Sequence, residues 1–531
     1  MNIAHRNHRP LIMGRHGAVG ANHPCATQVG LDILRAGGNA VDASVAISLA
    51  LGVAEPMMSG LGGDGFYHVF MAGTGKAEVF NGTGPAPAAA TPERYAQGID
   101  VDGPMSVSVP GSLAGIAAMH KAHGRMPWAG LVAPAATLAR EGFAATHNYR
   151  YFAGETRVRL EADARSAKVF LGHALVGLVV QADLARTLDE IAADGAETFY
   201  RGRLAARLAA GMREAGVLVT AADLAACHAE VTAPIGITYR GWEVRQTPPN
   251  STGFTMLQML KIVERFDLSK MSTADVVHVL VEAKKLAFLD REAYGSDPRY
   301  RDVPLARLLS DGHADMLAAR IDRARAATLV PVSEAAEGDT TYFAVVDAEG
   351  NAVSAIQSIN SGFGSGVTAG NTGVLLNNRM AYWHLTPGHA NRLVPGKRVR
   401  HTMNAPMVFR DGKLVAVLGT PGADNQVQVN LQVLTAMLDF GADPQTALEL
   451  PRWTSSQAGQ GANYPHDGDG ALTIESDFGE AVLADLAKRG HAVTPVGHLE
   501  GPCAMQAIQV MGNGVRVAGS DPRRDGWAGA Y

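Results

Sequence analysis

Two adjacent threonines in the run Gly338-Asp339-Thr340-Thr341 are the residues of this chain with the most specific chemical potential. A threonine that becomes the first residue of a cleaved chain carries a nucleophilic hydroxyl, and its own α-amine is the base that activates it. The weakly patterned residues 326–339 precede the pair and predict an exposed connection that would permit such a cut. Threonines that open a strand are also ordinary β-formers, so these four residues alone leave both interpretations open.

The other motifs that could carry chemistry are weaker. Residues 60–65, GLGGDG, have the letters of a dinucleotide-binding turn, but a helical pattern precedes them and the strand-like residues 66–70 follow. That turn needs a strand before it and a helix after it, because the phosphate binds at a helix N-terminus, so we expect only a tight turn. His384 and His389 have no further partner cluster in the sequence, so we expect no metal site. The sequence contains no GxSxG nucleophile elbow.

The composition is that of a globular protein, with 47% hydrophobic and 18% charged residues. A formal net charge of −5 gives no electrostatic reason to expect a nucleic acid or an acidic membrane surface as a partner. The longest apolar stretch, residues 40–58, contains two acidic residues and Pro56, so it predicts a buried helix and no membrane span. Residues 1–17 contain no apolar run that could form a signal core, so we expect a cytoplasmic protein.

The chain around the threonine pair divides into a helix-rich part before it and a strand-rich part after it. Apolar periodicity and end signals predict helices over residues 24–36, from 40 onward, and over 112–120, 127–140, 184–193, 204–215, 254–264, 274–294, 306–325 and 427–440. Alternation and turn residues predict a hairpin over residues 235–246 and strands over 342–346, 353–359, 373–376, 407–409 and 414–418. Strands with helices on their outer faces predict a layered α/β sandwich in which both parts share one core.

Residues 338–353, GDTTYFAVVDAEGNAV, resemble the start of the small subunit of the γ-glutamyltranspeptidases, and the resemblance extends over nearly the whole chain. Ordered matches are found at residues 26–46, 60–66, 109–115, 248–253, 375–380, 395–404, 419–425 and 519–531. Many separate matches in the same order are more specific than any single motif. The resemblance implies an αββα fold of the N-terminal-nucleophile hydrolases, formed jointly by two autoprocessed subunits.

The resemblance also implies a reaction and its residues. Cleavage between Asp339 and Thr340 would give a large subunit of residues 1–339 and a small subunit of residues 340–531, which together form one intertwined domain. Thr340 would be the nucleophile and its amine the base, and Ser358 would take the place of a second threonine beside it. The backbone N–H groups of Gly422 and Ala423 would form the oxyanion hole, since alanine keeps the N–H of the glycine it replaces. No metal or cofactor is expected.

Departures from the family pattern bear on the substrate. The family binds a glutamyl carboxylate through an arginine and two serines, where this chain has Thr83, His401 and Thr402. It binds the glutamyl ammonium through an asparagine, a glutamine and an aspartate, where this chain keeps Asn360 and has Arg379 and Tyr382. Loss of the aspartate removes the partner of an ammonium, and Arg379 adds a donor suited to a carboxylate, so a substrate with a carboxylate and no amine is expected.

The expected partner is therefore a small amide that bears a carboxylate. Oxamate, hydrolysed to oxalate and ammonia as in the oxamate amidohydrolase branch, is the first candidate. A γ-glutamyl hydrolase or transferase, a cephalosporin-type acylase and a fold that has lost activity are the alternatives. The heterodimer of the two subunits could assemble further into a homo-oligomer. Arg379 is expected to act on substrate only, which would leave autocleavage unaffected by its loss.

Overall fold

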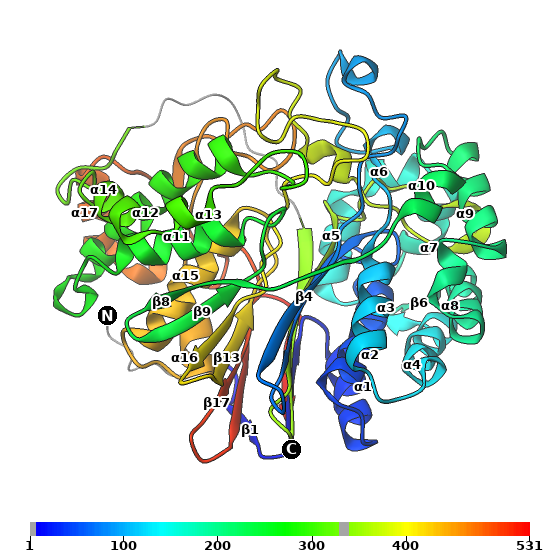
Figure 1. Cartoon of the computed structure of the whole chain (residues 1–531), viewed down its shortest axis with the longest axis horizontal. Coiled ribbons are helices and arrows are strands. Elements are labelled where there is room, and N and C mark those ends of the chain that lie inside the picture. Colours follow the sequence, from blue (N-terminus) through cyan, green and yellow to red (C-terminus); the bar gives the residue numbers. More distant parts are fainter. Residues whose placement is uncertain (1–6, 329–338) are drawn as a thin grey trace.

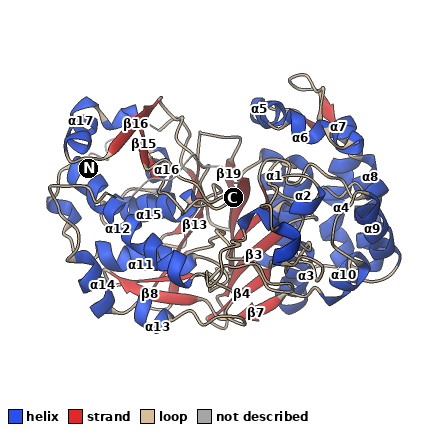
Figure 2. Cartoon of the chain, turned by 90° about the horizontal axis from the view of Figure 1, so that it is seen from above, coloured by secondary structure: helices blue, strands red, loops and turns tan. Residues whose placement is uncertain are grey.

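The computed structural model describes residues 7–328 and 339–531, and in it two β-sheets lie face to face between two layers of helices (Figure 1). Figure 2, seen from above, shows the strands in the middle and helices on both flanks. This is the αββα arrangement, so the prediction of a layered α/β sandwich is confirmed. None of the helices in the described residues is both long enough and apolar enough to cross a membrane.

Each sheet has seven strands, and all neighbouring strands in both are antiparallel. The first sheet has the spatial order β19 (Trp527–Ala530), β2 (Gly17–Ala21), β10 (Asp339–Asp347), β11 (Ala352–Asn360), β3 (Asp64–Met71), β4 (Lys76–Gly82) and β7 (Glu230–Thr232). The second has the order β1 (Ile12–Gly14), β18 (Arg516–Ser520), β17 (Gln506–Val510), β13 (Lys413–Gly419), β12 (Met407–Arg410), β9 (Trp242–Gln246) and β8 (Ile235–Tyr239). Both sheets combine strands from before and after Thr340, so the two parts of the chain share one core.

Strand β10 shows why this region reads as an apolar run in the sequence. Tyr342 and Ala344 point into the layer between the sheets, whereas Phe343 and Val345 point into the helical layer. Successive side chains of a strand face opposite sides, and here both sides are covered. The strand therefore holds its N-terminal end, where Thr340 lies, in a rigid position at the edge of the packed core.

The two helical layers cover the outer faces of the sheets. The first sheet is covered mainly by α1 (Pro24–Arg35), α2 (Ala40–Ala54), α3 (Ser112–His123), α4 (Trp128–Glu141), α8 (Ala182–Asp194) and α9 (Arg203–Glu214). The second is covered mainly by α11 (Gly253–Val263), α12 (Thr273–Tyr294), α15 (Asn425–Leu438), α16 (Pro444–Glu449) and α17 (Glu480–Lys488). Smaller elements surround them: α5 (His147–Glu155), α6 (Arg157–Glu161), α7 (Ala164–Phe170), α10 (Ala221–Ala226), β5 (Phe143–Ala144), β6 (Leu178–Val179), β14 (Trp453–Ser455), β15 (Ala471–Glu475) and β16 (Ala492–Val496).

Most elements begin and end within a few residues of the predicted positions, and the two that differ have local causes. The single helix predicted over residues 306–325 is wrong: the chain forms α13 (Leu305–Leu308) and α14 (Asp311–Ala318), because the Ser310 hydroxyl caps a new helix by accepting the His313 N–H. The strand predicted over residues 373–376 is also wrong. Gly373 has a φ of +69° against the backbone of α8, and the residues after it make only isolated bridges. Residues 329–338 of the predicted connection lie outside the described residues.

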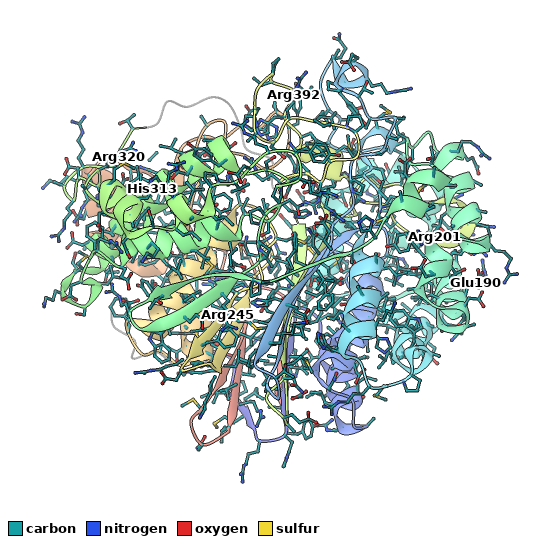
Figure 3. All side chains as sticks on the ribbon, viewed as in Figure 1. Glu190, Arg201, Arg245, His313, Arg320 and Arg392 are labelled. Carbon is teal, nitrogen blue, oxygen red and sulfur yellow. The ribbon has the colours of Figure 1, made fainter. Side chains whose placement is uncertain are left out.

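Charged side chains mark the outside of the molecule. Glu190, Arg201 and Arg320 lie at the outer edges of the two helical layers (Figure 3). Water solvates such groups at little cost, whereas a buried charge needs a partner of its own. Charged residues in the interior are therefore candidates for a chemical role.

Candidate active site

Thr340 lies at the start of β10 with 2% of its surface exposed, and its hydroxyl donates to Ser358 Oγ on β11 at 3.3 Å. The pairing of the two strands is irregular at this point. Asp339 pairs with Asn360 and Thr341 with Gln357, so β11 has one residue more than β10 between these pairs. Such a bulge bends the strand and re-aims its side chains, which here brings the two hydroxyls together.

Ser358 is a meeting point for hydrogen-bond donors. Its Oγ accepts the Asn360 N–H at 2.8 Å and Nη2 of Arg379 at 2.9 Å, in addition to the Thr340 hydroxyl. Asn360 has a φ of +83°, an unfavourable conformation for most residues that persists only where the surroundings hold it. One neutral hydroxyl thus separates the nucleophile from a buried guanidinium.

That guanidinium is paired with a carboxylate. Arg379 and Asp64 are each 1% exposed, and Nε of Arg379 donates to Asp64 Oδ2 at 3.1 Å. The other oxygen of Asp64 accepts the Gly84 N–H at 2.8 Å. Sequence reasoning predicted Arg379 as a cation for a substrate carboxylate and treated Asp64 only as part of a glycine-rich turn. Asp64 matches the charge of Arg379, and the contact of Arg379 with a substrate carboxylate stays a prediction.

His401 completes this cluster as a neutral group. Its Nε2 lies 3.4 Å from Asp64 Oδ2. Burial, and next the charge of Arg379, lower the pKa of His401 to about 4, so at neutral pH its ring donates without a charge. Burial disfavours ionisation of Asp64, but the hydrogen bond from His401 and the charge of Arg379 outweigh it and lower its pKa. At neutral pH the three side chains together carry no net charge.

Of the remaining predicted residues, Tyr382 and Thr402 lie in this cluster and Thr83 lies outside it. The Tyr382 hydroxyl and Thr402 Oγ1 are 3.1 Å apart, and the Arg379 guanidinium lies 4.5 Å from the centre of the Tyr382 ring. Thr83 instead donates to Asn81 Oδ1 at 2.7 Å. The structure thus brings together the predicted residues Thr340, Ser358, Asn360, Arg379, Tyr382, His401 and Thr402, and places Thr83 in a separate asparagine network.

Gly422 and Ala423 lie between β13 and the first turn of α15. Both have positive φ values, +114° and +45°, and a side chain on Gly422 would meet the Cys503 sulfur. Neither N–H donates to another described residue. Two unengaged N–H groups next to a helix N-terminus, where the helix dipole is positive, are suited to stabilise a developing oxyanion.

A cavity of about 410 Å³ borders this segment. Its wall includes Gly422 and Ala423 together with Lys284 and Phe288 of α12. The residues around Arg379 do not line it, since they pack tightly against one another at 0–3% exposure. Open space is therefore found beside the predicted oxyanion segment and not in the cluster that corresponds to the family's binding residues.

Two groups among the described residues have the composition of a metal site, and neither has the geometry. Glu292, His384 and His389 are close together, but the two rings are stacked with centroids 3.6 Å apart and planes 15° apart, so their nitrogens cannot converge on one ion. Arg400 also donates to Glu292 Oε2, the oxygen nearest to both rings, at 2.8 Å. In the second group, His278, Glu282 and His491, the two rings hydrogen-bond each other at 2.8 Å and Lys285 binds the carboxylate.

Comparison with known proteins gives a consistent result over the full length. The sequence profile of the gamma-glutamyltranspeptidase family matches residues 26–531. The chain is 38% identical to the glutathione hydrolase-like YwrD proenzyme of Bacillus subtilis, over 97% of this chain and 99% of that protein. It is 35% identical to the oxamate amidohydrolase proenzyme of Klebsiella pneumoniae, over 97% and 98%. The crystal structure of cephalosporin acylase from Bacillus halodurans superposes with a TM-score of 0.91 at 34% identity, over 99% of this chain and 98% of that one.

Proposed function

The chain belongs to the gamma-glutamyltranspeptidase family of N-terminal-nucleophile amidohydrolases, and we propose that Thr340 is its nucleophile, freed when the chain cleaves itself between Asp339 and Thr340. The observation that carries the proposal is the hydrogen bond from the Thr340 hydroxyl to Ser358. Cleavage yields the subunits 1–339 and 340–531, which stay together because both sheets contain strands of each.

The first reaction is an attack of Thr340 on its own chain. The hydroxyl oxygen bonds to the carbonyl carbon of Asp339 and its proton passes to the amide nitrogen, the C–N bond breaks, and the acyl group moves from nitrogen to oxygen as an ester. Water then hydrolyses the ester, which leaves a carboxylate on Asp339 and a free α-amine on Thr340. Ser358, which accepts from Arg379, offers the Thr340 oxygen a polar and electropositive surrounding while charge develops on it.

The second reaction uses the new amine. The α-amine of Thr340 takes the proton of its hydroxyl, the oxygen attacks the substrate amide, and the proton passes to the departing amine. The N–H groups of Gly422 and Ala423 donate to the tetrahedral oxyanion. Water then releases the acid and restores the threonine.

For the substrate we propose a small amide whose acyl part bears a carboxylate, with oxamate as the first candidate. The tight packing of Asn360, Arg379, Tyr382, His401 and Thr402 supports a short acyl group, because these side chains fill the space that a longer one would need. A relative that shares 35% identity is named for oxamate. A γ-glutamyl amide is the second candidate, favoured by a cavity of about 410 Å³ that exceeds the size of oxamate.

A substrate panel tests the choice. We expect purified enzyme to release ammonia from oxamate with a higher kcat/KM than it releases aniline from a γ-glutamyl anilide, and to act poorly on glutaryl amides. The same panel on Thr340→Ala measures the background. Turnover of the γ-glutamyl anilide with none of oxamate would overturn the small-acid proposal, and equal rates in the variant would overturn Thr340.

A further inference from the structure

The cavity beside the predicted oxyanion segment contains a buried lysine whose role the proposed function does not explain. Lys284 and Phe288 stand one turn apart on α12 and form one wall of the cavity, and Gly422 and Ala423 belong to another. Lys284 is 1% exposed. Its Nζ donates to the side-chain oxygen of Gln457 at 2.7 Å and lies 4.1 Å from the centre of the Phe288 ring.

Lys284 has a neutral side chain, Gln457, as its hydrogen-bond partner, whereas the other buried lysines bind acids or backbone carbonyls. It forms no ion pair with any of the described residues. Lys285 next to it pairs with Glu282 at 2.7 Å, and the Nζ of Lys397 donates to two backbone carbonyls. An ammonium group removed from water without an anion is costly, so such groups are usually paired. Lys284 also belongs to the wall of the cavity, where a partner could bind.

Two residues of the cavity wall also have acceptor atoms that lack hydrogen-bond partners among the described residues. Gln460 Oε1 and Asp424 Oδ2 are buried, and neither has a hydrogen-bond partner among the described residues. The other oxygen of Asp424 is occupied by Arg291. Unsatisfied buried acceptors carry a free-energy cost that a ligand N–H removes. Asp469, another acid of the wall, accepts both the Ser456 hydroxyl and the Ala471 N–H at its Oδ1.

We propose that Lys284 binds a carboxylate of the substrate in this cavity, while Gln460 and Asp424 accept N–H groups of the same molecule. The assignment rests on the proposed function in that it places part of the amide substrate here. A ligand of one or two amino acids in size fits a volume of about 410 Å³. The carboxylate could belong to the amine part or to the acyl part of the substrate, and the experiment separates the two sources.

The charge state of Lys284 supports this role. Burial lowers its pKa well below the ordinary value, Arg291 and Lys285 lower it further, and Asp424 and Glu292 oppose the shift. The free site therefore holds a lysine that gives up its proton more easily than an exposed lysine does. A bound carboxylate raises the pKa again, so binding takes up a proton and weakens as the pH rises above the pKa of the free site.

The experiment measures binding by calorimetry to the cleaved enzyme, with ligands other than the proposed amide substrates. Glycylglycine and glycylglycinamide represent the amine part with and without a carboxylate, and glutarate represents the acyl part. We expect one of the two carboxylates to bind with proton uptake, detected in buffers of different ionisation enthalpy, and glycylglycinamide to bind at least tenfold more weakly than glycylglycine if the amine part is the source.

Two variants and a control complete the design. Lys284→Met should weaken binding of the carboxylate ligand ten- to a hundred-fold and abolish proton uptake, since a charge-assisted hydrogen bond is lost. Gln457→Glu should do the same by giving Lys284 an internal anion, and it guards against misfolding of the first variant. Lys397→Met, a buried lysine outside the cavity, should bind as the wild type does.

The outcomes separate the two proposals. Absence of carboxylate binding in the wild type, or equal affinity and proton uptake in both Lys284→Met and the wild type, overturns the Lys284 site. A wild-type protein that binds the carboxylate in a Lys284-dependent way, but shows no chain cleavage or no turnover, would instead count against the Thr340 proposal. Binding of glycylglycine assigns the carboxylate to the amine part, and binding of glutarate assigns it to the acyl part.

Discussion

Two buried basic side chains near the candidate site, Arg379 and Lys284, meet opposite conditions. Arg379 is held by the Asp64 carboxylate at 3.1 Å and lies in a tightly packed cluster. Lys284 is equally buried, has the neutral Gln457 as its hydrogen-bond partner, and faces a cavity. A paired buried charge is fixed in place by its partner, whereas an unpaired one retains the capacity to bind an anion.

The difference divides the work of the site between two regions. Arg379 touches Ser358, which touches Thr340, so its position suits the support of charge on the nucleophile. Lys284 borders the cavity that includes Gly422 and Ala423, so its position suits recognition of substrate. The paired cation should therefore affect every reaction of Thr340, and the unpaired one only those of substrates with a carboxylate.

The largest effect is expected at Thr340, the proposed nucleophile. Thr340→Ala should leave the chain uncut and without detectable turnover, because no hydroxyl is present to attack Asp339 or a substrate. The wild type should give two bands on a denaturing gel, and the smaller one should begin Thr-Thr-Tyr. An active wild-type enzyme that remains a single chain would contradict the proposal that cleavage frees Thr340 as the nucleophile.

Loss of the Asp64 carboxylate should have the next largest effect. Asp64→Asn leaves Arg379 buried without an anion, which should lower the free energy of unfolding by about 3–5 kcal/mol. Thermal and urea unfolding measure it. The double variant with Arg379→Gln is the matched control and should be more stable than Asp64→Asn alone, because it carries no unpaired charge.

The same pair predicts a pH dependence. The folded-state pKa of Asp64 lies below its ordinary value of 3.8. Its ionised form therefore stabilises the fold fully at neutral pH, and this contribution is lost as the pH falls through the folded-state pKa. The stability gap between wild type and Asp64→Asn should be constant between pH 6 and 8, to about 0.5 kcal/mol, and shrink in acid. A gap that widened in acid would contradict the pairing.

The contrast also shows what the sequence could predict. Thr340, Ser358, Gly422 and Ala423 were predicted from the resemblance to a known family, and the apolar strands that hold the first two have clear periodicity. Asp64 was missed as a partner because 315 residues separate it from Arg379. No local pattern records a contact at that distance, and a charged residue within a glycine turn is ordinarily solvated.

Lys284 was missed for a different reason. It lies in the run EAKKLAF, where two adjacent lysines on a long helix suggest a solvated face. The structure buries both, and which of them meets an acid depends on the helices packed around α12. Cavities arise where side chains of distant segments fail to meet, so their position follows from tertiary packing and not from any one segment.

An intermediate effect is expected for the paired cation itself. Arg379→Gln should slow both autocleavage and turnover by about ten- to a hundred-fold, because a charge-assisted hydrogen bond to Ser358 is lost. This replaces the expectation that autocleavage is unaffected. The loss should be the same for substrates with and without a carboxylate, unlike that of Lys284→Met. A loss confined to carboxylate substrates, with normal autocleavage, would return Arg379 to the role of an anion ligand.

The smallest effect is expected at Ala423, which links the two regions because it lies in the oxyanion segment and lines the cavity. Its φ of +45° costs an alanine about 1–2 kcal/mol, whereas glycine adopts this conformation freely. Ala423→Gly should relieve that strain, but glycine also gains freedom in the unfolded chain, which offsets about 0.5–1 kcal/mol.

We therefore expect Ala423→Gly to raise the stability by no more than about 1 kcal/mol and to change kcat/KM by less than about threefold, since the N–H is retained. Differential scanning calorimetry and oxamate kinetics measure the two quantities. Ala423→Pro is the matched opposite, because it removes the N–H and cannot adopt a positive φ. If Ala423→Gly lost activity as Ala423→Pro should, the methyl group of Ala423 would be contributing to substrate binding in addition to the N–H.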